Sequence, residues 1–441
     1  MLGKPVDTIV ITSDTFDRVP SDRCFCVFLA FVIHGLGCFL PWNLLFHSYE
    51  YFVCCKFLGD DSDIYRQYFL SFCALAALLA ALVSTGIGLF IGFHGDTKRR
   101  VIPSIVVLII MFILQVLFAV FDARDSSGVF LCITILNIVV IGAFIGLYLS
   151  SVAGIVAYFP DRYVNALVIG TSLGILIAIC SRIGFKYYTN DPRVIAIYFL
   201  VTAVVTLLFC FDVYFAFPYS RLFRFYHTSI KIDLLHKTKG HLLHVPYGNV
   251  LKQIWLQCFS IWLHYLSTVT IFPSILIQVQ SVTPNFFHTN LQFVDAVVLI
   301  NFALFNLLGN FLAGCVKKPY SRWISFLVFI RAILALIIFL FVNFEPNSRH
   351  NVPVLIRNDY VFMSLVIVFG FTHGYLNSMI QMLTTKSVEP YLSATTAVLL
   401  QLFIFAGCFF GIIGSKLTKR NIINARIARI KTKNDIHREY G

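Results

Sequence analysis

The residues of this sequence that could do chemistry are polar side chains standing inside long apolar runs. Asn306 and Asn310 are four residues apart, so on a helix they share one face with Phe302. An amide carries both a donor and an acceptor, which suits recognition of a neutral polar solute. The alternative interpretation is a hydrogen-bonded clasp between helices, because an unpaired amide in apolar surroundings costs free energy.

Two further side chains are unusual for their surroundings. Arg331 stands about nine residues inside another apolar run. A cation at that depth is costly and indicates a functional role, such as bonding to backbone carbonyls or to solute hydroxyls. The alternative is that its side chain extends to the nearer surface. His373 lies in a later run, where a histidine is either a satisfied hydrogen-bonding group or a group that changes its charge.

Prolines beside aromatic rings mark two helix ends. Pro41 is followed by Trp42 and Asn43, and Phe272 precedes Pro273. Proline bends a helix, and in hydrocarbon the freed backbone groups must be satisfied by protein or by a water-filled cavity. The first cluster therefore predicts a bend lining a path, or else a structural kink with its indole at the membrane interface. For Phe272, stacking on a planar solute and plain core packing are equally good explanations.

The elements that must position these residues are membrane-spanning helices. Hydrophobic residues make up 59% of the chain and charged residues 12%, whereas charge runs near a quarter in soluble proteins. Eleven apolar runs are each near the roughly 20 residues that a spanning helix needs. The sequence predicts an all-α polytopic membrane protein with spans at about 24–46, 67–93, 101–121, 129–158, 163–184, 194–217, 251–279, 292–315, 322–344, 359–383 and 392–415.

The order of these runs predicts how the chain is organised. We expect a cytosolic amino-terminal tail (1–23), six transmembrane helices (24–217), a basic cytosolic central loop (218–250), five transmembrane helices (251–415) and a basic carboxy-terminal tail (416–441). The split into six and five helices suggests two bundles facing a central path, as in major-facilitator-like transporters. The loop Lys and Arg residues favour a cytosolic amino terminus. The side of the carboxy-terminal tail stays open, because eleven spans would place its basic residues opposite.

Small residues recur at helical spacing in two neighbouring spans. Gly142, Gly146 and Gly154 lie along one helix face, and Gly170 and Gly174 have the same spacing in the next span. Such stripes let another helix backbone approach closely. They indicate either helices that slide along these faces during transport or ordinary helix packing.

Missing residue types also restrict the function. None of the 21 acidic residues falls in the middle third of a span, whereas proton- or sodium-coupled carriers generally keep a carboxylate there. This favours uncoupled, equilibrative movement. No catalytic triad, phosphate-binding loop or metal-ligand spacing occurs, so we expect no enzyme, no cofactor and no metal site. We attribute the net charge of +13 to an excess of Lys and Arg in the loops and to contact with lipid head groups, rather than to nucleic-acid binding.

Several motifs resemble those of the equilibrative nucleoside transporter family, and they occur in the same order. The segment GLGCFLPWN (35–43), with Asp22-Arg23 before it, is similar to the family's first helix. Later matches are an FPxxY junction containing Pro160, a TxTxFP segment ending at Pro273, an RWxxxxxxxR pattern ending at Arg331, and an (S/T)NGYL-like signature in which His373 replaces Asn and Tyr375 is kept. The resemblance covers about residues 22–415.

The eighth span departs from the family pattern FxxxDxxGRxL. Asn306 replaces the Asp and Asn310 replaces the Arg, so the charge-assisted hydrogen bonds of the usual pair are lost. Gly146 stands where some members carry a glutamine that contacts the base. This site is therefore expected to be less polar than the family norm.

The resemblance implies a divergent equilibrative nucleoside transporter whose two bundles rock about a midplane site. Its implied substrate-binding residues are Trp42, Phe272 and Phe302, which contact the base, and Asn306, Asn310 and Arg331, which bind the sugar or gate the path; Asn43 is a further substrate-binding residue. Its implied gating and packing residues are Pro41, Gly142, Gly146, Gly154, Pro160, Gly170, Gly174, Pro273, His373 and Tyr375.

Two rival functions remain. The fold could carry nucleobases or another small neutral solute, because the charged pair of the eighth span is replaced. It could also be a transport-inactive sensor or scaffold that uses the basic tail for binding. The expected partners are nucleosides or nucleobases and the lipid bilayer, with the oligomeric state open. The plasma membrane is the expected location and an internal membrane is the alternative.

Overall fold

The chain folds into a bundle of long helices. The computed structural model describes residues 19–48, 51–52, 63–90, 98–120, 127–238, 247–283, 290–316, 321–344 and 353–439. Among these residues, eleven helices are long and apolar enough to cross a membrane, and β-structure is limited to two isolated bridges. The predicted all-α class and the predicted number of spans are therefore confirmed. The predicted amino-terminal tail lies outside the described residues up to residue 18.

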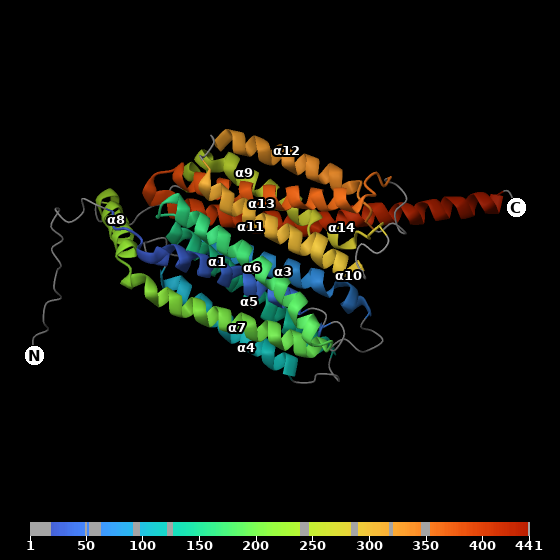
Figure 1. Cartoon of the computed structure of the whole chain (residues 1–441), viewed down its shortest axis with the longest axis horizontal. Coiled ribbons are helices and arrows are strands. Elements are labelled where there is room, and N and C mark those ends of the chain that lie inside the picture. Colours follow the sequence, from blue (N-terminus) through green and yellow to red (C-terminus); the bar gives the residue numbers. More distant parts are fainter. Residues whose placement is uncertain are drawn as a thin grey trace, which may run out of the picture.

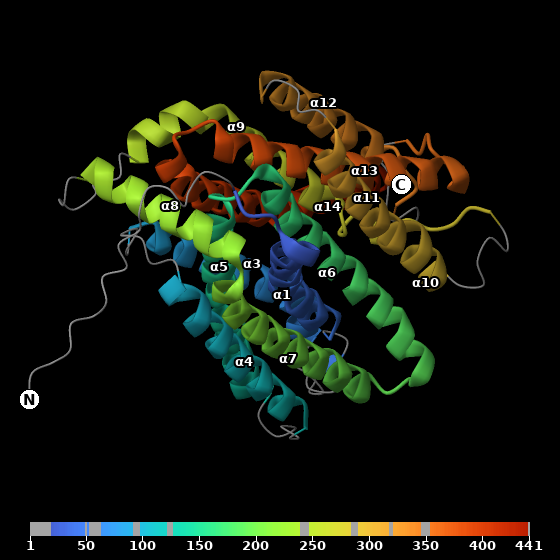
Figure 2. The ribbon, with the colours of Figure 1, turned by 60° about the vertical axis from the view of Figure 1, so that its left-hand side comes forward.

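Two groups of spanning helices follow one another along the chain (Figures 1 and 2). The first bundle consists of α1 (Cys26–His47), α3 (Asp63–Phe90), α4 (Lys98–Val120), α5 (Ser127–Val156), α6 (Asp161–Tyr188) and α7 (Pro192–Ala216). The second bundle consists of α9 (Tyr247–Ile271), the π-helical η7 (Val294–Ile300) continuing into α11 (Asn301–Cys315), α12 (Ser321–Leu340), α13 (Asp359–Lys386) and α14 (Ser393–Glu439). The predicted division into six and five helices is confirmed.

Two elements extend beyond the spanning part. The central loop carries α8 (Arg221–Thr238), which lies at the end of the molecule where α1 begins. We call that end the amino-terminal side. The last helix, α14, runs without a break past its spanning part, which ends at Thr418, and reaches Glu439 on the opposite side (Figure 1).

Glycines bring helix backbones together inside each bundle. Hydrophobic side chains gain little by leaving lipid, so helix association in a membrane depends on close packing. In the first bundle, a Cβ atom on Gly170 of α6 would collide with the backbone of Val32 and Gly35 of α1. In the second bundle, a Cβ on Gly374 of α13 would collide with the backbone of Asn306 in α11. Both helix pairs therefore pack at a distance that a larger residue could not permit.

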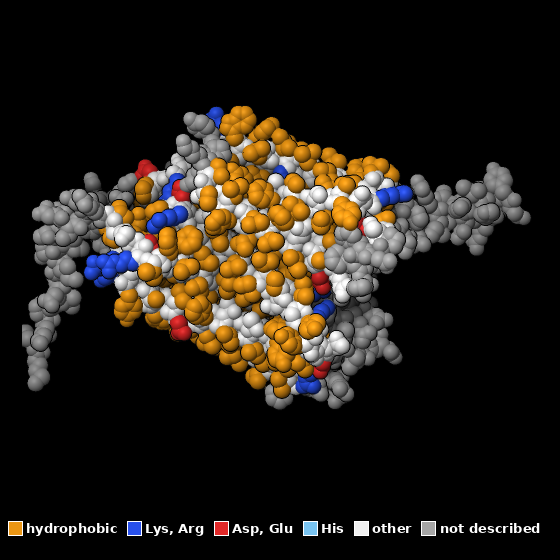
Figure 3. Space-filling view, in the orientation of Figure 1, with side chains coloured by type: hydrophobic (Ala, Val, Ile, Leu, Met, Phe, Trp, Pro, Cys, Tyr) orange, Lys and Arg blue, Asp and Glu red, His pale blue; other side chains and the backbone are white. Residues whose placement is uncertain are grey.

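The surface agrees with a membrane-spanning bundle. Figure 3 shows apolar side chains covering the middle of one face, while charged side chains gather toward the two ends. The exposed large apolar residues include Val205 and Phe209 of α7, as well as Phe329 and Leu334 of α12. These exposed apolar faces are the ones that a lipid bilayer would cover.

The two bundles are bridged on both sides of the molecule. On the amino-terminal side, Lys386 at the end of α13 donates hydrogen bonds to the carbonyl oxygens of Ala157 (3.1 Å) and Phe159 (2.8 Å), just beyond α5. On the opposite side, Arg182 of α6 forms an ion pair with Asp295 of η7 at 3.6 Å. The path between the bundles is thus bridged at each end in this structure.

Candidate functional site

A buried polar cluster joins the two bundles near the middle of their helices. Asn306 donates from its side-chain nitrogen to the hydroxyl of Ser172 at 3.2 Å, and Asn310 donates to the same hydroxyl. Asn310 also donates to the Oδ1 of Asn306 at 3.4 Å and accepts from the hydroxyl of Ser378 at 2.8 Å. All four side chains are at most 2% exposed. We call these four residues the polar clasp.

The polar clasp is a contact between bundles. Ser172 belongs to α6 of the first bundle, whereas both of its partners, Asn306 and Asn310, belong to α11 of the second, and Ser378, which donates to Asn310, belongs to α13. A further bond runs beside it, from the side-chain nitrogen of Asn165 in α6 to the backbone oxygen of Asn310 at 3.1 Å. The Oδ1 of Asn165 is buried without a hydrogen-bond partner among the described residues. The structure therefore brings the two predicted asparagines together, with partners that carry no charge.

Arg331 lies in a separate polar group inside the second bundle. Its side chain, 8% exposed, donates to the hydroxyls of Thr372 (3.1 Å) and Thr268 (3.0 Å) and to the backbone oxygen of Phe369 (3.3 Å). The guanidinium carbon also lies 4.6 Å from the centre of the Phe369 ring. These partners come from α9 and α13, so the described contacts of Arg331 hold α12 to its own bundle.

Aromatic rings form a column next to this arginine. Phe272 and Phe302 stack with ring centres 4.0 Å apart and an interplanar angle of 17°. Phe302 also lies 5.7 Å from His373, which stacks on His264 at 4.6 Å. The Nδ1 atom of His373 lies 3.3 Å from the hydroxyl of Thr268. Since the two phenylalanines cover each other, a planar solute could enter between them only after they separate.

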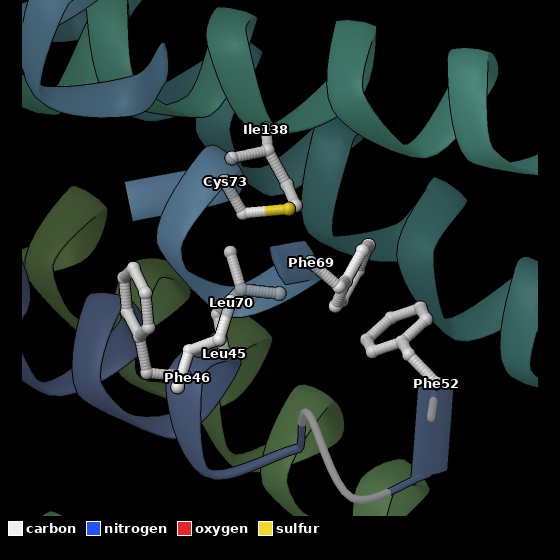
Figure 4. A pocket seen from close by; sticks show the side chains of 7 residues that line it. All are labelled: Leu45, Phe46, Phe52, Phe69, Leu70, Cys73 and Ile138. Carbon is white, nitrogen blue, oxygen red and sulfur yellow. The ribbon is translucent and has the colours of Figure 1, made fainter. Parts of the chain in front are cut away.

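The predicted residues of the first helix lie elsewhere. Trp42 packs edge-on against Phe46 at 4.6 Å, and Asn43 donates to the backbone oxygen of Phe39 at 2.7 Å. Phe46 in turn lines a small apolar pocket of the first bundle (Figure 4), formed with Leu45, Phe52, Phe69, Leu70, Cys73 and Ile138. Trp42 packs against one apolar cluster, whereas Phe302 belongs to another, against which Phe272 packs. The structure does not bring Trp42 together with those two phenylalanines.

The predicted gating and packing residues occupy helix junctions and helix seams. Pro41 is buried inside α1, and Pro160 is the residue before α6. Gly142 and Gly146 lie against Ala77 and Ala81 of α3, and Gly174 lies against Leu40 of α1. The remaining positions are Gly154, buried in α5; Gly170, against α1; Pro273, just after α9; and Tyr375, whose ring stacks on Phe371 at 6.5 Å.

Sequence reasoning missed a second chain of buried amides. Asn377 accepts hydrogen bonds from Tyr265 (3.2 Å) and from Gln381 (2.9 Å), and Gln381 accepts one from Gln401 at 3.2 Å. Asn377 and Gln381 are four residues apart on α13, the same spacing that identified the asparagines of α11. The signal was therefore present in the sequence. Ser172 gave no such signal, because a single serine in an apolar helix is common and often bonds to its own backbone.

Comparisons with known proteins place these observations in context. The family model described as "Nucleoside transporter" matches residues 135–239 and 229–419. Equilibrative nucleoside transporter 1 of Rattus norvegicus is 23% identical over 465 residues, which cover 92% of this chain and 99% of that protein. Equilibrative nucleoside transporter 3 of Rattus norvegicus is 24% identical, with 93% and 91% covered.

A solved structure confirms the architecture. The major facilitator superfamily proton:xylose symporter XylE, bound to 6-bromo-6-deoxy-D-glucose, superimposes with a TM-score of 0.60 and 12% identity. The match covers 90% of this chain and 88% of that one. At this identity the likeness concerns the fold, so the predicted major-facilitator-like arrangement of two bundles is confirmed.

Proposed function

This chain belongs to the nucleoside transporter family, and we propose that it moves nucleosides across a membrane down their concentration gradient. The relatives named equilibrative nucleoside transporters match along nearly their whole length, which supports carrying this activity over to the chain. Movement would occur by alternating access, with the two bundles rocking about a site between them.

The observation that carries this proposal is the polar clasp. A solute that passes between the bundles must pass where α6 faces α11 and α13, because these helices close the path at its middle. Asn306, Asn310, Ser172 and Ser378 form a neutral set of donors and acceptors there. Sugar hydroxyls also donate and accept without charge. They can therefore replace these hydrogen bonds one for one while the bundles separate.

The cost of opening the clasp is moderate. A neutral hydrogen bond contributes about 0.5–1.5 kcal/mol net, so the few bonds between α6 and the second bundle sum to about 2–4 kcal/mol. A buried group left unpaired would cost more, which favours opening while a polar solute is bound. This coupling of solute binding to bundle separation needs no ion gradient.

We assign the remaining predicted site residues within this mechanism. Phe272 and Phe302 would separate and offer their flat faces to the nucleobase while the solute is on the side of the polar clasp away from Lys386, since aromatic rings stack with an offset at such distances. Arg331 would keep α12 and α9 fixed in position while the second bundle moves as a unit. Trp42 and Asn43 would line the path from the first helix once α1 moves away from its present neighbours.

We also propose the setting of the protein. The multi-pass architecture belongs in a membrane, and we take the plasma membrane as its location. The basic loops favour a cytosolic amino terminus, which makes the amino-terminal side the cytosolic side. Transport of free nucleobases is a second candidate function, favoured by the uncharged character of Asn306 and Asn310.

Uptake into cells lacking their own nucleoside carriers tests the proposal. Labelled adenosine, uridine, adenine and uracil are offered at pH 5.5 and 7.4. We expect saturable nucleoside uptake that ends at equal concentrations and does not depend on pH. Asn306→Ala should lower uptake by about tenfold, because it leaves the Ser172 hydroxyl without one partner at the bundle interface. Asn301→Ala is the matched control, since Asn301 donates to Met363 within the same bundle.

The Asn306→Asp/Asn310→Arg double variant tests the proposed substrate independently of the fold. If wild-type protein carries only bases, the second candidate function replaces the first. If only the double variant carries nucleosides, neutral amides do not serve as the sugar site and the proposed substrate is wrong. Correctly inserted wild-type protein that moves none of the four compounds would refute the transport function altogether.

A further inference from the structure

The amide chain of Tyr265, Asn377, Gln381 and Gln401 borders a cavity between the bundles. Gln381 and Gln401 line this cavity together with Thr385 of α13 and with Ala397 and Leu400 of α14. The facing wall comes from the first bundle and is apolar, formed by Ala153, Val156, Val164 and Leu167. The two glutamines are 7% and 3% exposed. A polar edge from one bundle thus faces an apolar wall from the other.

The cavity lies between the polar clasp and the bridge made by Lys386. Along α13, Gln381 follows Ser378 of the clasp by three residues, a rise of about 4.5 Å, and Lys386 follows after a further rise of about 7.5 Å. A solute that leaves the clasp toward the amino-terminal side must therefore pass this cavity. In this conformation it has room for about one water molecule, so binding requires the bundles to part here.

The amide chain leaves hydrogen-bonding capacity unused. Gln401 donates to Gln381, and Gln381 donates to Asn377, which also accepts from Tyr265. Within the described residues, these bonds leave the Oε1 of Gln401 and the Nδ2 of Asn377 unused, and Gln381 has used one of its two N–H groups. A polar group inside a protein is stabilised when it gains a hydrogen-bond partner. Both glutamines line the cavity.

We propose that this cavity is the part of the transport site that reads the nucleobase, with Gln401 and Gln381 as the residues that determine specificity. This inference rests on the proposed function for the class of solute. A primary amide presents a donor beside an acceptor, and this edge pairs bidentately with a nucleobase edge. The valines and Leu167 of the apolar wall then cover the faces of the flat ring.

The base and the sugar of one nucleoside would bind to different groups. A base held by Gln381 leaves its sugar about one helical turn away, at Ser378 and Asn310 of the polar clasp. The sugar then interacts with hydroxyl and amide groups, while the base interacts with amides alone. Each nucleobase offers a donor beside an acceptor, so the site selects for the base ring rather than for purine or pyrimidine.

A comparison of two solutes within each variant tests the assignment. Adenosine and purine riboside share the sugar and the ring, but purine riboside lacks the 6-amino donor. We expect wild-type protein to prefer adenosine by about five- to hundredfold, the range typical of one bidentate pair. In Gln401→Met this preference should fall to about one. The ratio does not depend on how much protein reaches the membrane.

One control and one further variant make the ratio specific. Gln115→Met removes a fully buried glutamine of α4, outside the cavity, and should keep the wild-type preference. Gln381→Met provides a second variant of the amide chain, expected to lower the preference in the same direction. If Gln401→Met and Gln381→Met transport adenosine with the wild-type preference, the base-reading assignment is overturned and the transport function stands. If wild-type protein neither binds nor carries any nucleoside or base, both the function and this inference fall.

Discussion

Lys386 provides a direct test of how the two bundles are held together. Its ammonium group donates to the backbone oxygens of Ala157 and Phe159, just beyond the end of α5. Carbonyl oxygens at this end of a helix lack helical partners, and the negative end of the helix dipole lies there. A hydrogen bond to a charged group contributes about 1.5–3 kcal/mol when buried, but the Lys386 side chain is exposed and solvent screens it. We therefore take about 1 kcal/mol for the bridge. Lys386→Met should shift the conformational equilibrium by roughly fivefold toward opening on the amino-terminal side.

Thiol labelling of a cavity residue measures this shift. Ala397, which lines the cavity and is 4% exposed, is replaced by Cys, and labelling at that position is followed by mass spectrometry of the peptide. We expect labelling about fivefold faster with Lys386→Met, and an unchanged rate with Lys386→Arg, which keeps the donors. Lys252→Met is the matched control, because Lys252 is an exposed lysine at the start of α9. Equal rates in Lys386→Met and in the parent protein would refute the bridge.

Three further predictions follow from other contacts. Asp295→Asn removes the ion pair with Arg182 on the opposite side, so labelling of the same cavity position should become several-fold slower, the reverse of the lysine result. Gly170→Ala should destabilise the purified protein by about 1–3 kcal/mol in thermal unfolding, because its Cβ meets the α1 backbone, whereas Gly184→Ala, with open space around it, should not. Arg331→Lys keeps the charge but loses the planar fork, so it should lower stability by about 2 kcal/mol without changing the adenosine preference.

The sequence by itself determined the spanning helices and the polar residues that had to be explained. An apolar run of sufficient length forms a helix in a membrane, because the backbone must satisfy its own hydrogen bonds there. The number of spans, the all-α class and the unusual character of Asn306, Asn310 and Arg331 follow from this rule and need no tertiary information. The family motifs depend on local residue order, so they could be identified from the sequence as well.

Spacing along one helix predicts which residues share a face, but not what that face meets. Asn306 and Asn310 were expected either to bind solute or to clasp another helix, and only the tertiary structure supplied Ser172, 134 residues away from Asn306, as a shared partner. Arg331 was expected at the site, yet its described partners belong to its own bundle.

The tertiary structure also decided which groups lie along the path. It placed Trp42 and Phe302 in different apolar clusters, and it aligned Gln381 with Gln401 on a neighbouring helix. These partners depend on how helices from distant parts of the chain cross. Close glycine contacts such as that of Gly374 with the α11 backbone fix those crossings. Such contacts are set by the shapes of both helices together, and neither helix sequence contains them alone.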